Sequence, residues 1–279
     1  MTQDTRKQKL VIVGNGMAPG RMLEHLFEAT DQYEVTIFNA EPRVNYDRIM
    51  LSPVLSGEKT YADIIIHGEG WYEEHGITLH QGDKISEIRR HERKVISESG
   101  VVAEYDKLVI ATGSNPFIIP VPGHELPGVL AYRDLDDTDG MIKAADIGGR
   151  AVVIGGGLLG LEAAAGLKMR GMEVTVIHLM PTLMERQLDT AAGYLLQKEL
   201  ESRGIEVRCE ANTKQILGTD KVEGVELADG TVIDASLVVM AVGIRPNVTL
   251  AQEAGLEINR GIVTDATMKT SDANIYSVG

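Results

Sequence analysis

Two stretches of this sequence repeat one pattern of apolar and glycine positions. In each, a short apolar run, at residues 9–13 or 151–154, ends in a glycine-rich turn. A helical pattern follows, and then a second apolar run at residues 34–38 or 173–178. Short apolar runs bounded by glycine are typical of buried parallel strands, and a helix between two of them predicts a βαβ unit. The pattern therefore indicates an α/β fold that is built twice.

Each βαβ unit is followed by three short strand patterns separated by turn-like residues. We expect each set to form an antiparallel meander, at residues 85–88, 94–97 and 101–105 and again at residues 206–211, 222–227 and 231–233. Another buried strand follows each meander, and these strands end near Gly113 and Gly243. The repeat predicts two Rossmann-like, three-layer dinucleotide-binding domains, the second inserted in the first. Prolines near residue 120 mark a linker, which assigns residues 1–120 and 243–279 to one domain and residues 121–242 to the other.

The turn of the second repeat has the spacing G-x-G-x-x-G, in which Gly155, Gly157 and Gly160 have separate tasks. The first glycine permits a tight turn, the second lets the backbone approach a pyrophosphate, and the third lets the helix pack closely on the strand. Leu158 and Leu159 begin that helix, whose unpaired N–H groups and positive dipole attract phosphate. The alternative is a glycine turn that serves packing alone. The strand before the turn and the helix after it favour a dinucleotide site.

The first repeat carries a related turn, Gly14-Asn15-Gly16-Met17-Ala18-Pro19-Gly20, with proline where the third glycine is expected. Proline is tolerated in the first turn of a helix, because its missing N–H has no helical partner there, although its ring could push the helix off the strand. The acid that would bind a ribose is displaced from the strand end, where Asn39 stands, to Glu41. The alternative for Glu41 is a solvated loop carboxylate.

Charge and cysteine content exclude several classes of protein. The 279 residues carry a net charge of −14, which argues against a nucleic acid partner because such binding needs a basic face. The single cysteine, Cys209, excludes an internal disulfide, a Cys-x-x-Cys redox pair and an iron–sulfur cluster held by this chain's own cysteines. We expect Cys209 to be a buried strand residue without chemistry. No apolar leader or membrane-length apolar run occurs, which favours the cytoplasm and no membrane partner, and no metal site is expected.

The whole sequence resembles the two-dinucleotide flavoprotein family of pyridine nucleotide oxidoreductases. The resemblance rests on residues 155–162, 111–113 and 270–279. Within that family the sequence is most similar to the N-terminal module of the large subunit of NAD(P)H-dependent nitrite reductase. The residues that carry this closer similarity are Gly14-Asn15-Gly16-Met17, Asn45-Tyr46-Asp47-Arg48, Leu51-Ser52, Gly157-Leu158-Leu159-Gly160-Leu161-Glu162, Pro181-Thr182-Leu183-Met184 and Gln187-Leu188-Asp189.

The resemblance implies an FAD-dependent NAD(P)H oxidoreductase, with FAD on the first domain, NAD(P)H on the second and hydride transfer from nicotinamide to flavin. The cofactor-binding residues it implies are Gly14, Gly16, Met17, Glu41, Arg48, Ala111, Thr112, Gly113, Gly155, Gly157, Leu158, Leu159, Gly160, Glu162, His178, Gly243 and Gly279. Electrons would then pass to a 4Fe–4S cluster and sirohaem that reduce nitrite to ammonium, in a C-terminal region or small subunit outside this sequence. The resemblance also admits a homodimer.

Two residues are candidates for a direct role in hydride transfer. In relatives the acid at the position of Glu162 faces the nicotinamide and often pairs with a lysine. That lysine is replaced by Pro53 here, so Arg48 is the candidate substitute cation. NAD-preferring relatives have glutamate where this chain has His178, which could bond a ribose hydroxyl or, when protonated, attract the 2′-phosphate of NADPH. We therefore expect use of both coenzymes, and the alternative is an exposed loop histidine without contacts.

Two other functions stay open on the sequence alone. A freestanding NAD(P)H:ferredoxin or NAD(P)H:rubredoxin reductase would have the same two domains. Cysteine clusters encoded downstream would distinguish a nitrite reductase from it. A non-enzymatic flavoprotein that senses nucleotides is an alternative of another class, and steady NADH turnover with a dye acceptor would exclude it.

Overall fold

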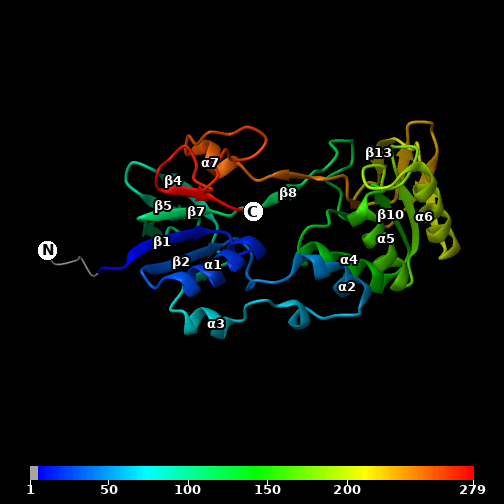
Figure 1. The fold of residues 1–279 in the computed structure, drawn as a ribbon. Coiled ribbons are helices and arrows are strands. Elements are labelled where there is room, and N and C mark those ends of the chain that lie inside the picture. The colour runs from blue at the N-terminus through cyan, green and yellow to red at the C-terminus, as the bar shows by residue number, and fades with distance from the viewer. Residues whose placement is uncertain (1–5) are drawn as a thin grey trace. The chain divides into compact units, whose positions relative to one another are not determined.

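The computed structural model describes residues 6–279, which fold into two compact units. Unit 1 consists of the chain up to Asp47 together with Ile64–Ser114 and Pro246–Gly279, and unit 2 consists of Arg48–Asp63 and Asn115–Arg245. Arg48–Asp63 belongs to unit 2 although it lies within residues 1–120, which the sequence assigns to the first domain. Figure 1 shows the chain and labels its elements.

Unit 1 is built on a five-stranded parallel sheet. Its strands, in spatial order, are β18 (Ile275–Ser277), β7 (Lys107–Ile110), β1 (Gln8–Val13), β2 (Tyr33–Asn39) and β3 (Thr78–Gln81). The central strand β1 pairs in parallel with β2 on one side and with β7 on the other. Its last four residues are buried, because a parallel strand in the middle of a sheet has both faces covered.

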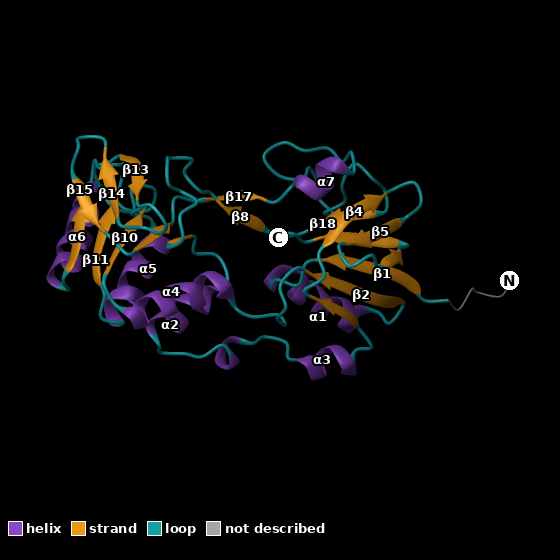
Figure 2. Cartoon of the chain, turned by 180° about the vertical axis from the view of Figure 1, so that it is seen from behind, coloured by secondary structure: helices purple, strands orange, loops and turns teal. Residues whose placement is uncertain are grey.

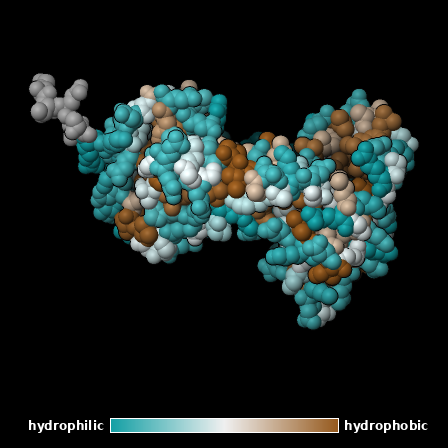
Figure 3. Space-filling view, turned by 90° about the horizontal axis from the view of Figure 1, so that it is seen from below, coloured by the Kyte–Doolittle hydropathy of each residue, from teal (hydrophilic) through white to brown (hydrophobic). Residues whose placement is uncertain are grey.

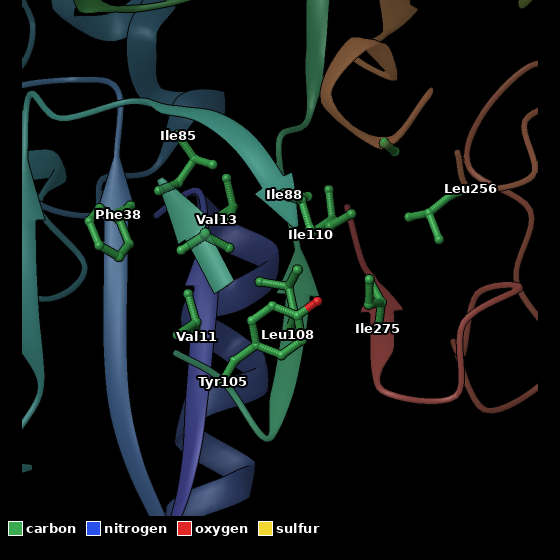
Figure 4. Close-up of a cluster of buried hydrophobic side chains, with 12 residues drawn as sticks. Val11, Val13, Phe38, Ile85, Ile88, Tyr105, Leu108, Ile110, Leu256 and Ile275 are labelled. Atoms are coloured by element: carbon green, nitrogen blue, oxygen red, sulfur yellow. The ribbon is translucent and has the colours of Figure 1, made fainter. Parts of the chain in front are cut away.

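The two faces of this sheet are covered by different elements. Helix α1 (Met17–Ala29) connects β1 to β2 and lies on the side of the sheet away from β4 and β5 (Figures 1 and 2). The antiparallel meander consists of β4 (Ile85–Arg89), β5 (Lys94–Ser97) and β6 (Val102–Glu104), as expected. Val11 and Val13 of the sheet share one buried cluster with Ile85 and Ile88 of the meander (Figure 4). The short helices α3 (Glu69–Glu74) and α7 (Thr249–Glu253) complete the unit.

Unit 2 repeats this plan. Its parallel sheet contains, in spatial order, β12 (Ile205–Arg208), β11 (Glu173–Ile177), β10 (Arg150–Ile154), β16 (Leu237–Met240) and β9 (Val129–Leu130). The helices are α4 (Leu135–Ile147), α5 (Leu158–Met169) and α6 (Thr190–Ser202). The second meander consists of β13 (Thr213–Leu217), β14 (Gly224–Leu227) and β15 (Val232–Asp234). Two three-layer domains, each with a meander, are therefore confirmed.

One strand assignment from the sequence is wrong. The run at residues 206–211 was expected to open the second meander, but it supplies β12, which pairs in parallel with β11 at the edge of the main sheet. The meander instead begins at Thr213, with a strand that the apolar pattern did not mark. Cys209 lies just past the end of β12 and is only half-buried, and burial raises the pKa of its thiol.

The segment from Arg48 to Asp63 forms a 3₁₀ turn (Arg48–Met50), helix α2 (Leu51–Ser56) and a second 3₁₀ turn that begins at Ala62. Helix α2 packs on α4 and α5. A Cβ at Gly166 of α5 would lie 2.8 Å from Cγ of Leu55, so the absence of a side chain here lets α2 and α5 approach closely. The guanidinium of Arg170 donates to the carbonyl oxygens of Val54 and Leu55 and so satisfies the end of α2.

Two short strands, β8 (Ser114–Pro116) and β17 (Ile244–Pro246), pair with each other at the places where the chain leaves one unit for the other.

Hydrophilic side chains cover most of the surface of each unit in the view of Figure 3. Within residues 6–279 no helix has the length and apolar character needed to span a membrane.

Candidate functional site

Both glycine turns lie at the carboxyl edge of a parallel sheet. Gly14 follows β1, which has β2 on one side and β7 on the other, and Gly155 follows β10, which has β11 and β16 as neighbours. The strand order reverses at these central strands. Ligands of open α/β sheets bind outside the carboxyl ends of the strands at this point. The topology therefore places one candidate ligand site in each unit.

The first turn brings the backbone of two strands into close contact. Gly14 has a φ of +109°, and a Cβ there would lie 2.2 Å from the carbonyl oxygen of Ala111 at the end of β7. A Cβ at Gly16 would meet nothing within 4 Å. The first glycine is thus required by packing, whereas the second leaves open space at the start of α1, where a pyrophosphate can approach. Gly279 lies beside the first turn of α1, since a Cβ there would lie 3.3 Å from Cβ of Ala18.

A buried polar network that sequence reasoning missed holds this turn. The side-chain amide of Asn45, which is 1% exposed, donates to the carbonyl oxygens of Asn15 and Gly16 at 2.9 and 2.5 Å. The amide of Asn15 donates to the hydroxyl of Tyr72 at 2.9 Å. Because buried backbone carbonyls need partners, this network fixes the turn in one conformation. The sequence signal was the motif Asn45-Tyr46-Asp47-Arg48, whose role the pattern alone did not explain.

The proline of the first turn does not interrupt the helix. Pro19 is the third residue of α1, and the N–H of Gly20 still donates to the carbonyl of Gly16 at 3.2 Å. The helix keeps its bonds because a first-turn N–H has no helical acceptor to lose. Met17, another predicted cofactor residue, begins the helix and is half-buried.

The remaining predicted residues of unit 1 lie at the same edge. The Oε2 atom of Glu41 accepts a hydrogen bond of 2.7 Å from the hydroxyl of Tyr46, so this acid is held by a neighbour. The hydroxyl of Thr112 donates to the carbonyl of Asn247 at 2.7 Å, which leaves the backbone of Thr112 and Gly113 as the groups that can face a ligand. Gly113 has a φ of +64° and open space around its Cα.

The second turn shows all three tasks of the G-x-G-x-x-G motif. A Cβ at Gly155 would lie 2.3 Å from the carbonyl oxygen of Ala241, and a Cβ at Gly160 would lie 2.0 Å from the carbonyl oxygen of Gly155. A Cβ at Gly157 would meet nothing within 4 Å. Helix α5 begins directly after Gly157, so the N–H groups of its first turn border the open space. Three more predicted residues lie at this edge: Leu158 and Leu159 in the first turn of α5, and Gly243 past β16.

His178 is not the exposed loop histidine that was the alternative reading. Its side chain is 11% exposed and lies directly after β11. Its Nδ1 accepts a 3.0 Å hydrogen bond from the N–H of Gly156, and its Nε2 lies 3.1 Å from Oε2 of Glu185. Glu185 was not among the predicted residues, although it lies between residues 181–184 and 187–189, two stretches that carry the resemblance.

Glu162 lies in the first half of α5 at the end of a chain of hydroxyl groups. Its Oε2 accepts from the hydroxyl of Ser52 at 2.7 Å, and the hydroxyl of Tyr132 donates to Ser52 at 3.1 Å. Burial, with the charge of Glu162 adding to it, raises the pKa of Tyr132 to about 12, so its hydroxyl stays protonated and remains a donor. Arg48, the proposed cation partner of Glu162, donates to the carbonyl of Arg133 at 3.1 Å.

The described part of the chain contains no candidate set of metal ligands. Among residues 6–279 no group of three or more histidine, cysteine, aspartate and glutamate side chains could hold a metal ion. The two glycine turns fit dinucleotides instead, because each pairs a closely packed first glycine with open space at a helix start.

Comparisons with known proteins agree with this geometry. The family model described as pyridine nucleotide-disulphide oxidoreductase matches residues 8–279. The chain is 50% identical over 274 residues to the NAD(P)H nitrite reductase of Bacillus subtilis (strain 168), which covers 98% of this chain and 34% of that protein. It is 44% identical over 275 residues to the assimilatory nitrate reductase electron transfer subunit of the same organism, which covers 98% of this chain and 36% of that protein.

The fold is also similar to that of a solved reductase structure. The chain matches a ferredoxin reductase from Rhodopseudomonas palustris with a TM-score of 0.92 and 31% identity, over 98% of this chain and 68% of that one. The chain spans about a third of the length of the two Bacillus subtilis relatives. From the match over residues 8–279 and these likenesses, the chain belongs to the pyridine nucleotide-disulphide oxidoreductase family.

Proposed function

We propose that this chain is the electron-entry module of a nitrite reductase of the NAD(P)H-dependent type. The observation that carries the proposal is the pair of glycine turns. Gly14 and Gly155 are both pressed against a neighbouring strand, at 2.2 and 2.3 Å for an added Cβ, while Gly16 and Gly157 both face open space. Two dinucleotide sites in one chain suit an enzyme that takes hydride from a nicotinamide nucleotide and gives it to a flavin.

The two sites receive different nucleotides in this proposal. FAD, which accepts a hydride from the nicotinamide and passes the electrons onward, would be held by unit 1. The residues proposed for it are Gly14, Gly16, Met17, Glu41, Ala111, Thr112, Gly113 and Gly279. NAD(P)H would be held by unit 2. The residues proposed for it are Gly155, Gly157, Leu158, Leu159, Gly160, Glu162 and His178. Gly243 and Arg48 are also proposed to contact a cofactor.

The side chains bind and orient the nucleotides. The carboxylate of Glu162, which the hydroxyl of Ser52 holds in place, can accept a hydrogen bond from the carboxamide or ribose of the nicotinamide half. Arg48 would supply positive charge near that carboxylate. The chain has a single cysteine, so a redox-active disulfide of its own plays no part.

The proposal also names the acceptor that receives the electrons from FAD. The name of the Bacillus subtilis relative at 50% identity supports a nitrite-reducing centre, which would contain an iron–sulfur cluster and sirohaem outside this sequence. The relative at 44% identity is named as an electron transfer subunit of a nitrate reductase, so a separate reductase subunit is the second candidate partner. A cytoplasmic location and a homodimer stay predictions.

The test separates the two sites. Gly16→Val and Gly157→Val each place a side chain in the space proposed for a pyrophosphate. With FAD added, we expect the Gly16 variant to lose bound flavin, and the Gly157 variant to keep its flavin spectrum but lose flavin reduction by NADH. Wild-type protein should turn over NADH steadily with ferricyanide. Flavin binding without turnover would instead indicate a nucleotide sensor, and retention of flavin by the Gly16 variant would contradict the assignment of unit 1.

A further inference from the structure

The segment after β11 brings a carboxylate to the place where a dinucleotide's adenosine ribose binds. In Rossmann folds, an acid at this strand end accepts hydrogen bonds from the ribose hydroxyls. Here β11 ends at Ile177 and His178 follows, so the strand end has no acid of its own. Glu185 supplies one from 7 positions along the chain, with its Oε2 atom 3.1 Å from Nε2 of His178.

Hydrogen bonds decide what the histidine can do. Because Nδ1 of His178 accepts the N–H of Gly156 at 3.0 Å, the ring proton lies on Nε2 and is donated to Glu185. Both ring nitrogens are therefore engaged within the protein. The side chain of His178 is 11% exposed and that of Glu185 is 29% exposed, so the carboxylate is the more accessible of the two. In this geometry His178 contributes to the proposed nucleotide site by holding Glu185 in place.

The backbone holds the loop of Glu185 in place. The N–H of Met184 donates to the carbonyl of Gly156 at 3.0 Å, and Met184 has a φ of +55°, a left-handed conformation that few side chains adopt. Leu183 is fully buried. A Cβ at Gly156 would lie 2.5 Å from Cδ2 of Leu183 and 2.7 Å from Cγ of His178. A glycine at this variable position of the motif thus makes room for the histidine and its loop.

Two arginines nearby could instead favour the 2′-phosphate of NADPH. Arg208 donates to Oε1 of Glu206 at 2.7 Å, so its charge already has a partner. The side chain of Arg186 is 87% exposed, and its Nε lies 4.0 Å from Oε1 of Glu185. A long exposed side chain of this kind is held weakly, whereas Glu185 is held by His178, whose side chain is only 11% exposed.

We propose that Glu185 is the residue that selects NADH over NADPH, and that His178 is a positioning residue which holds it at the strand end. The carboxylate accepts a hydrogen bond from the 2′-hydroxyl of NADH and repels the 2′-phosphate of NADPH. The inference rests on the proposed function of unit 2 and names the coenzyme for it.

The test measures affinity and not activity. Calorimetric titration of the FAD-loaded chain with NAD⁺ and NADP⁺ gives two dissociation constants. The ratio used below is the dissociation constant for NADP⁺ divided by that for NAD⁺. We expect wild-type protein to bind NAD⁺ at least about tenfold more tightly than NADP⁺. Glu185→Gln keeps an acceptor for His178 but removes the charge, and it should bring the ratio about tenfold closer to one.

Three further variants make the test specific. His178→Asn can still accept from Gly156 but is too short to reach Glu185, so it should also lower the ratio. A double variant, His178→Glu with Glu185→Gln, places an acid at the strand end and should restore the preference for NAD⁺. Glu173→Gln removes the same charge from the opposite end of β11, where Glu173 pairs with Arg150 at 2.7 Å, and should leave the ratio unchanged.

The possible outcomes separate the inference from the function on which it rests. A wild-type preference for NADP⁺, or a preference for NAD⁺ that Glu185→Gln leaves intact, would overturn the inference while unit 2 remained a nucleotide site. Failure of wild-type protein to bind either nucleotide would overturn the proposed function of unit 2 and the inference with it.

Discussion

The hydroxyl of Ser52 donates a 2.7 Å hydrogen bond to Oε2 of Glu162, from 110 positions away in the sequence. Ser52 belongs to α2 and Glu162 to α5, and α2 packs on α5 within unit 2. The bond fixes the rotamer of the only acid in the first two turns of α5. A carboxylate that is already oriented loses less conformational entropy when a nicotinamide binds.

Removal of this charge should slow flavin reduction. Glu162→Gln keeps an acceptor for Ser52, so the fold around it should be preserved. We expect the rate of flavin reduction by NADH, followed by stopped-flow absorbance, to fall by about tenfold or more. Ser52→Ala keeps the charge and loses only the hydrogen bond, so its rate should fall less and its unfolding free energy by about 1 kcal/mol. Equal rates for wild type and Glu162→Gln would show that Glu162 does not touch the nucleotide.

Glu41 should contribute to the affinity for FAD. Its Oε2 atom accepts the hydroxyl of Tyr46 at 2.7 Å and lies past the end of β2, at the edge where the ribose of a dinucleotide binds. Glu41→Gln should raise the dissociation constant for FAD, measured by quenching of flavin fluorescence, by about tenfold. Glu34→Gln, which changes an exposed acid near the start of the same strand, is the matched control and should bind FAD as wild type does.

Two glycines of one motif should respond differently to alanine. A Cβ at Gly160 would lie 2.0 Å from the backbone oxygen of Gly155, so Gly160→Ala must move α5 away from its turn. We expect the unfolding free energy to fall by about 1–3 kcal/mol and the melting temperature to drop by several degrees. Gly157→Ala has open space for its methyl group and should melt as wild type does. A thermal scan in which both variants match wild type would mean that α5 has room to shift.

Asp137 should make stability depend on pH. Burial, with the charge of Asp134 adding to it, raises the pKa of Asp137 from 3.8 to about 6 in the folded chain. The folded state therefore binds a proton between about pH 4 and pH 6 that the unfolded state does not, so this group stabilises the fold at low pH and loses that contribution as pH rises through 6. After allowance for its partial exposure, the loss at pH 7 is about 1–2 kcal/mol.

Asp137→Asn should remove this dependence while it keeps an acceptor for the N–H of Arg133, which lies 2.7 Å from Oδ2 of Asp137. We expect the variant to melt at a higher temperature than wild type at pH 7 and at a similar temperature at pH 4. Asp146→Asn changes an exposed acid of the same helix and serves as control. The prediction fails if the difference between Asp137→Asn and wild type is the same at both pH values.

The glycine turns and central strands could be predicted from the sequence because their signals are local. An apolar run that ends in Gly155-Gly156-Gly157 has few other structures open to it, since the strand must be buried and the turn must admit backbone contacts. The same reasoning located His178 at a strand end. It failed for residues 206–211, because alternation of apolar residues does not tell an edge strand of a parallel sheet from a strand of a meander.

The residues that hold the site in place could not be predicted, because their contacts are made far along the chain. Glu185 reaches His178 only through a loop in which Met184 is left-handed and bonded to Gly156. Ser52 reaches Glu162 only because α2 packs on α5. Neither the loop nor the helix contact has a periodic signature, so the sequence predicted the residues of the two glycine turns but not the contacts that hold Glu162 and His178.

The placement of Arg48–Asp63 with the second unit limits how this protein can be divided or recombined. A gene fragment that encodes only residues 115–245 would lack α2, and the surfaces of α4 and α5 that α2 covers would face water. The guanidinium of Arg170 would also lose its two hydrogen-bond acceptors, the backbone oxygens of Val54 and Leu55. A chimera that exchanges unit 2 between relatives should therefore transfer two separate stretches of coding sequence, residues 48–63 as well as 115–245.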